Sequence, residues 1–286
     1  MARLKAMPAT PGCTLMAEQE TGPYYLGDRL LRQNVTEGKP GLPLRLRIAL
    51  VDARQCNPLP GAALDLWQCD ALGVYSGFTA NGPNGRGGRG RRGMGPPPGP
   101  PPDGAGDGFG PGMPPPPPPG ADDWGRMGPP PARSTDASRF LRGVQLTDPQ
   151  GMAEFTTIYP GWYVGRAIHI HLKVRVGGRA ADGTYAGGHV SHTGQLFFPE
   201  EVTDEVAKLQ PYARRIEIER TPQSEDGVFN RQHGAASMVR LARLSPRSNA
   251  DGFVATVTLA VDPEATPAPV GIGGPGGRRG PGPPGR

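Results

Sequence analysis

The chain has 286 residues, 45 of them glycine and 37 proline, and a formal net charge of +5 at pH 7. No segment reaches the roughly 18 consecutive apolar residues of a membrane-spanning helix, so we expect no membrane span. The three cysteines, Cys13, Cys56 and Cys69, are too few and wrongly spaced for a zinc knuckle. Whether two of them form a disulfide is left open.

The glycines and prolines are concentrated in two segments. Residues 84–133 hold 15 Gly and 16 Pro, and residues 263–286 have a similar composition. Such composition is typical of low-complexity chain rather than of a packed core. The sequence therefore predicts one domain over residues 1–262, interrupted by a Pro/Gly-rich insertion at 84–133 and followed by a disordered tail at 263–286. What the insertion and the tail do is left open.

The predicted elements are mainly strands. Residues 44–51, LRLRIALV, alternate apolar and polar side chains with the period of a half-buried strand. Further strands are expected at 63–69, 151–158, 167–176, 194–198 and 253–261, and one short helix at 199–209. Many short strands with little helix predict a mostly β protein, with an antiparallel β-sandwich core, short helices and long irregular loops.

The expected strand at 167–176, AIHIHLKVRV, carries two histidines on one face. Its five apolar residues occupy the even positions, whereas His169 and His171 occupy odd ones. Because residues i and i+2 of a strand point the same way, the two imidazoles lie side by side and could converge on a metal ion. The spacing alone also fits a solvated polar face.

Four segments then occur in the order found in a known family. They are ETGPYY (20–25), LPGAALDLWQCDALGVYSGF (59–78), FLRGVQLTDPQGMAEFTTIYPGWYVGRAIHIH (140–171) and HTGQLFFPEE (192–201). In these segments the chain resembles the intradiol ring-cleavage dioxygenases of the protocatechuate and catechol type. GPYY begins at residue 22, which leaves no room for the N-terminal helical region of the catechol type and favours the protocatechuate-like or the small extracellular-like branch. The opening residues, MPATPGCTLMAEQETGPYY, resemble the small extracellular-like branch most.

The resemblance implies an Fe(III) site formed by Tyr75, Tyr163, His169 and His171. Tyr159 competes for the second tyrosine position, but the spacing to Arg166 and to the histidines favours Tyr163. A phenol with a pKa near 10 becomes a strong ligand once it has lost its proton, and a trivalent cation drives that loss. Two phenolates favour ferric over ferrous iron, unlike the two-histidine, one-carboxylate sites of ferrous oxygenases.

The resemblance also assigns roles around the iron. Arg166 corresponds to an arginine that stabilises negative charge on the ring, and Tyr163 is expected to leave the iron and take part in proton transfer. Gln195, Pro23 and Tyr24 are expected to line the substrate pocket. The implied reaction cleaves a catechol-type ring between its two hydroxyls with O2 and gives a muconic-type diacid.

Two other functions are compatible with parts of the sequence. One is a non-catalytic binding protein on the same β-sandwich, acting through aromatic, polymer or partner binding. The other is an Arg/Gly-type nucleic-acid binder, which is disfavoured because few aromatic residues are interleaved with the arginines of the insertion. A homo-oligomer is possible. Two locations stay open: outside the cell, with a leader removed, or the cytoplasm.

Overall fold

The structure is a computed structural model that describes residues 13–82, 132–215, 217–246 and 248–271. Most of the expected insertion at 84–133 lies outside the described residues. The chain is described up to Gly271, past residue 263 where the tail was expected to begin, and Gly271 itself is buried. Within the described ranges, no helix is long and apolar enough to cross a membrane.

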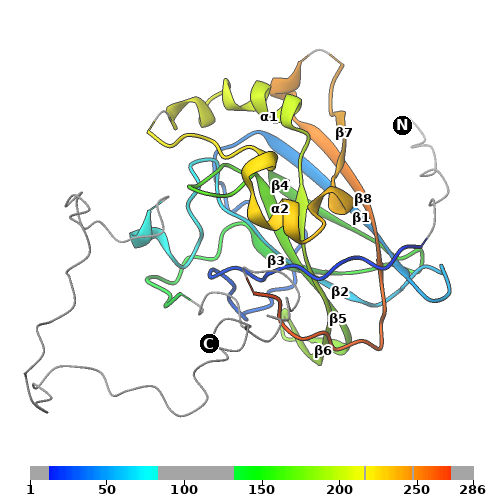
Figure 1. Cartoon of the computed structure of the whole chain (residues 1–286). Coiled ribbons are helices and arrows are strands. Elements are labelled where there is room, and N and C mark those ends of the chain that lie inside the picture. The colour runs from blue at the N-terminus through cyan, green and yellow to red at the C-terminus, as the bar shows by residue number, and fades with distance from the viewer. Residues whose placement is uncertain (1–12, 83–131, 216, 247, 272–286) are drawn as a thin grey trace, which may run out of the picture.

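The described residues form two four-stranded sheets (Figure 1). The first has the order β4-β1-β8-β7, with β1 at Pro43–Asp52, β4 at Met152–Ile158, β7 at Arg240–Arg243 and β8 at Phe253–Val261. The second has the order β3-β2-β5-β6, with β2 at Ala63–Trp67, β3 at Arg142–Leu146, β5 at His169–Ala181 and β6 at Thr184–Phe197. Neighbouring strands are antiparallel except β1 and β8, which are parallel.

The core lies between the two sheets and confirms the predicted β-sandwich. Leu44, Leu46, Ile48 and Leu50 of β1 lie in one buried cluster with apolar residues of β2, β5 and β8, such as Leu66, Leu172 and Leu259. The alternation read from the sequence decides this, since every second side chain of each strand points to the same face. The other face of the second sheet is covered by loops, by the short helix α2 and by a smaller aromatic cluster.

The helices are short, as expected. Helix α1 covers Glu200–Ala207, within the expected 199–209, and begins after Pro199. In Figure 1 it lies at the opposite end of the molecule from the turn that joins β5 and β6. Helix α2 covers Gly227–Arg231. Single turns of 3-10 helix occur at Thr79–Asn81, Tyr212–Arg214, Gln223–Glu225, Gly234–Ser237 and Asn249–Asp251.

Some strand boundaries differ from the sequence-based expectation. The strand expected at 167–176 begins only at His169 and continues to Ala181, and the one expected at 194–198 begins at Thr184. Residues 184–193 are rich in glycine and polar side chains, so they lack an apolar alternation. Their strand conformation comes from the backbone ladder with β5. Strands β3 and β7 were not predicted.

A disulfide joins Cys13 to Cys56, with the two Cα atoms 5.5 Å apart, and Cys69 is buried and free. The sequence left this pairing open. Disulfides persist mainly in oxidising compartments, so the bond favours the extracellular of the two expected locations.

Candidate metal centre

The outer face of the second sheet carries a row of three side chains across three strands. Trp67 of β2 is paired with His171 of β5, and His171 is paired with Gln195 of β6. Directly opposed residues point to the same face of a sheet, so the three lie side by side. The indole of Trp67 stacks on the His171 ring with centroids 4.9 Å apart and planes 1° apart. The register therefore fixes His171 from both sides.

Two loops bring tyrosines to the same face. Gly161 donates its backbone N–H to Asp70, and a Cβ at Gly161 would lie 2.5 Å from the carbonyl oxygens of Asp70 and Ala71. Gly73, with φ +76°, would place a Cβ only 2.1 Å from the carbonyl oxygen of Trp162. Only glycine permits such close backbone contact between the loops. Their packing sets the hydroxyl-bearing residues that follow, Tyr75 and Tyr163, beside each other, with ring centroids 5.7 Å apart.

Four polar side chains meet where these elements converge. The Nε2 atoms of His169 and His171 are 3.0 Å apart, and the Tyr163 hydroxyl is 3.1 Å from His169 Nε2. Tyr75 packs against Tyr163 and against the His171 ring. The hydroxyl of Tyr75 is buried and has no hydrogen-bond partner among the described residues. The structure thus brings together all four residues expected to hold iron.

The protonation of the cluster suits metal binding. His169 Nδ1 lies 2.7 Å from the carbonyl oxygen of Ala167, which can only accept, so Nδ1 carries the proton and Nε2 has a free lone pair. Burial, with Arg166 nearby, lowers the pKa of His169 to about 3. Burial and the neighbouring His169 also lower the pKa of His171. Burial raises the pKa of both Tyr75 and Tyr163, so neither phenol ionises near neutral pH without a cation.

The arrangement fits a transition-metal ion. Two ligand atoms about 2.1 Å from a metal and at right angles to each other are about 3.0 Å apart, which matches the observed Nε2–Nε2 separation. A cation would also give the buried Tyr75 hydroxyl oxygen a partner. Among the described residues, no group of three or more His, Cys, Asp or Glu side chains is placed to hold a metal ion. Half of this donor set is phenolic, which selects a hard, highly charged cation.

Tyr159, the competing tyrosine, lies elsewhere. Its hydroxyl is 2.7 Å from Thr203 Oγ1, and its ring packs on Phe198 in the main core. The two tyrosines are four positions apart, but β4 ends at Ile158, and Tyr163 packs against the smaller aromatic cluster that contains Tyr75. Of the two tyrosines, only Tyr163 contacts the histidines.

Arg166 and Gln195 lie next to the cluster and bind each other. Arg166 donates Nη2–H to Gln195 Oε1 at 2.5 Å, Nε–H to Asp226 at 3.0 Å and Nη1–H to Glu20 at 3.4 Å. Gln195 in turn donates to the backbone carbonyl of Glu20. Arginine has five N–H donors. These three bonds fix the plane of the guanidinium, and the other two donors are not engaged by the described residues.

Pro23 and Tyr24 form a wall beside the tyrosines. The Tyr24 ring stacks on Tyr75 with centroids 4.7 Å apart and lies edge-on to Tyr163 at 6.5 Å. The carbonyl of Pro23 accepts a hydrogen bond from Ala132, where the chain returns from the insertion. Both residues are half-buried. That the two residues line the substrate pocket stays a prediction.

Three neighbours of the site were not singled out from the sequence. Trp67 was detectable, because it lies on the polar face of an expected strand beside a candidate ligand strand. Glu20 is the first residue of the ETGPYY segment, but nothing in the local sequence indicates that it contacts Arg166. Asp226 is separated by more than fifty residues from every candidate ligand. The only local sequence pattern around it is that of an N-cap residue before a short helix, which does not indicate a role at the metal site.

Because the folded protein disfavours protonation of His169, the metal-free protein is expected to lose stability as the pH falls from about 6.5 toward about 3. The unfolded chain takes up a proton near pH 6.5, whereas folded His169 does so only near 3. His169 should therefore lower the free energy of unfolding by up to about 1.4 kcal/mol per pH unit in this window. Urea unfolding at several pH values measures the slope, and His169→Asn is the control. Equal slopes for both proteins would contradict the expectation.

The chain is similar to solved dioxygenases. No protein-family model matches the chain, and no curated protein matches it. Among solved structures, an intradiol ring-cleavage dioxygenase from Tetranychus urticae is 27% identical, with a TM-score of 0.65 over 91% of this chain and 100% of that chain. A second solved dioxygenase is 27% identical over the same shares, with a TM-score of 0.64.

The chain therefore combines a two-sheet fold and a tyrosine–histidine cluster with similarity to two solved dioxygenase structures. The resemblance to the intradiol ring-cleavage dioxygenases that the sequence motifs indicated is confirmed by this structural similarity.

Proposed function

We propose that the chain is a non-haem Fe(III) dioxygenase that cleaves a catechol-type ring between its two hydroxyls with O2, giving a muconic-type diacid. The observation that carries the proposal is the convergence of two imidazole Nε2 atoms, 3.0 Å apart, with two tyrosine hydroxyls. The similarity to an intradiol ring-cleavage dioxygenase supports the reaction type. The substituents on the ring are left open.

Tyr75, Tyr163, His169 and His171 would hold the iron. When bound, a ferric ion would bind an ortho-diphenol as a Lewis acid and draw electron density from it. Tyr75 is 3% exposed, whereas Tyr163 is half-buried, so Tyr163 is the more accessible of the two tyrosines to an arriving diphenol. Tyr163 Oη can then take up a proton from a substrate hydroxyl, while Tyr75 stays in place.

Arg166 would stabilise negative charge on the bound ring. Its guanidinium is held in one orientation by Gln195, Asp226 and Glu20, so it needs no reorganisation during the reaction. Its two remaining N–H donors are available to a substrate. The aromatic wall formed by Tyr24 excludes water from the side of Tyr75.

The test is a visible absorption spectrum of the ferric-loaded protein, taken without oxygen before and after catechol is added, followed by oxygen and analysis of the product. We expect a broad tyrosinate-to-iron band that moves to longer wavelength with catechol, and a ring-opened diacid once oxygen enters. A protein that binds catechol but shows no such band and opens no ring would contradict the proposal and support the binding-protein alternative.

A further inference from the structure

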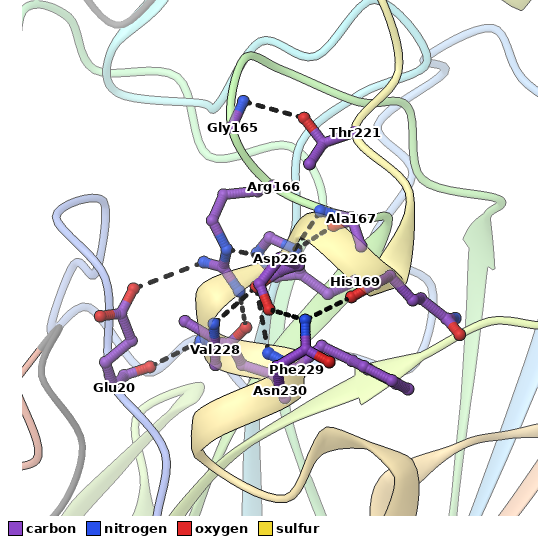
Figure 2. Close-up of polar contacts among 12 residues, drawn as sticks. Glu20, Gly165, Arg166, Ala167, His169, Thr221, Asp226, Val228, Phe229 and Asn230 are labelled. Carbon is purple, nitrogen blue, oxygen red and sulfur yellow. Dashed lines mark hydrogen bonds and ion pairs between the residues drawn. The ribbon is translucent and has the colours of Figure 1, made fainter.

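Asp226 is a buried carboxylate whose two oxygens receive four N–H groups. It is 0% exposed and directly precedes α2. Its Oδ1 accepts from the backbone N–H of Val228 at 2.7 Å and of Phe229 at 3.1 Å, which caps the helix. Its Oδ2 accepts from Arg166 Nε at 3.0 Å and from the Ala167 N–H at 2.7 Å. Figure 2 shows Asp226 between α2 and the segment that contains Arg166 and Ala167.

One of these contacts leads to a candidate iron ligand. The peptide N–H of Ala167 donates to Asp226, and the carbonyl of Ala167 accepts from His169 Nδ1 at 2.7 Å (Figure 2). That second bond keeps the proton on Nδ1 and leaves Nε2 free to bind a metal. A carbonyl or carboxylate that orients a ligating histidine in this way also adjusts its basicity. Asp226 therefore acts on His169 through a single residue.

The other contact leads to the candidate catalytic arginine. Asp226 holds Arg166 at Nε, while Gln195 and Glu20 hold the two outer nitrogens. The hydrogen bond from Nε to Asp226 fixes the rotation of the guanidinium plane about the axis of the Arg166 side chain. Burial by itself would raise the pKa of the Asp226 carboxyl, but Arg166 and the backbone N–H donors bring it below its ordinary value. The group is thus an anion near neutral pH.

Helix capping alone does not account for these contacts. Capping of α2 uses Oδ1, and serine or asparagine would satisfy the same two N–H groups. The contacts of Oδ2 lie on the opposite side, toward Arg166 and Ala167. Only a carboxylate offers two acceptor oxygens to donors on both sides. Burying a charged group for capping alone would be costly, so the second oxygen has a separate role.

We propose that Asp226 is a positioning residue of the metal centre, which holds the Arg166–Ala167 segment so that Arg166 faces the substrate and His169 Nε2 faces the metal. The proposal rests on the proposed function of the site. Asp226 itself touches neither substrate nor metal, and it acts through Arg166 and through the Ala167 peptide.

The test compares Asp226→Asn and Asp226→Ser with Asn230→Ala. In Asp226→Asn, the amide oxygen can still cap α2, but the NH2 group then faces the N–H donors of Arg166 and Ala167 and cannot accept from them. In Asp226→Ser, the hydroxyl caps the helix but is too short to reach Arg166. The Asn230 side chain binds the carbonyls of Gln223, Ser224 and Asp226, so Asn230→Ala loosens the same turn and leaves both contacts of Oδ2 in place.

Three quantities are measured: the thermal midpoint, ferric affinity by competition with a chelator, and the imidazole 15N shifts of His169 in the metal-free protein. We expect both Asp226 variants to lose about 10–100-fold in ferric affinity and to show a mixture of His169 tautomers. Asn230→Ala should lose stability but keep the affinity and the single Nδ1–H tautomer.

The role of Asp226 is overturned if its variants match Asn230→Ala in affinity and tautomer at equal loss of stability. Wild-type protein that binds no ferric ion would instead contradict the proposed function. In that case the tautomer shifts, which are read without metal, still decide whether Asp226 orients His169.

Discussion

Replacing Tyr75 by phenylalanine is expected to weaken ferric binding strongly and at the same time to stabilise the metal-free protein. The Tyr75 hydroxyl is buried and has no hydrogen-bond partner among the described residues. An unsatisfied buried polar group costs about 1–3 kcal/mol, so its removal should raise the free energy of unfolding by about that amount. Ferric affinity should fall more than about 100-fold, because the loss of a residue that merely supports a ligand already costs about 10–100-fold.

Tyr159→Phe is the matched control for this change. It also removes a buried tyrosine hydroxyl, but that hydroxyl is bound to Thr203 in the core, away from the site. We expect this variant to lose about 1 kcal/mol of stability and to keep both the ferric absorption band and turnover. Chemical denaturation without metal and titration with a ferric chelate measure the two effects. A Tyr75→Phe protein that binds iron like the wild type would rule out Tyr75 as a ligand.

Arg166→Lys is expected to lower kcat by about 100- to 1000-fold, the range found when one preorganised donor to a developing negative charge is removed. Lysine keeps the positive charge between Asp226 and Glu20, so neither buried carboxylate is left without a cation. It lacks the planar fork that binds three acceptors at once. The ammonium group should therefore preserve folding while losing the orientation toward the substrate.

Steady-state kinetics and thermal unfolding separate these effects. Arg220→Lys serves as the control, because Arg220 also bridges two carboxylates, those of Glu200 and Asp204, but at the surface beside α1. It should leave kcat unchanged. A wild-type kcat in Arg166→Lys would show that charge alone suffices at this position. Arg166→Ala is a poorer probe, since removing one partner of a buried ion pair destabilises by about 3–5 kcal/mol.

Part of the site follows from local sequence rules. The alternation around His169 and His171 places both imidazoles on one face, and the paired strands keep them there. The resemblance of four collinear segments added the two tyrosines, Arg166 and Gln195, and the structure brings these residues together. What each of them does in the reaction stays a prediction.

The sequence by itself determined the β-sandwich, because strand periodicity depends on neighbours two residues apart. It also determined which strand presents the histidines. The resemblance already favoured Tyr163 over Tyr159, and the structure places Tyr163 against His169. The tertiary structure alone decided that Cys13 pairs with Cys56 and that Asp226 lies behind Arg166 and Ala167. These contacts join residues far apart in the chain. They depend on how loops pack, through close contacts such as that of Gly73 with Trp162, and no local pattern encodes that packing.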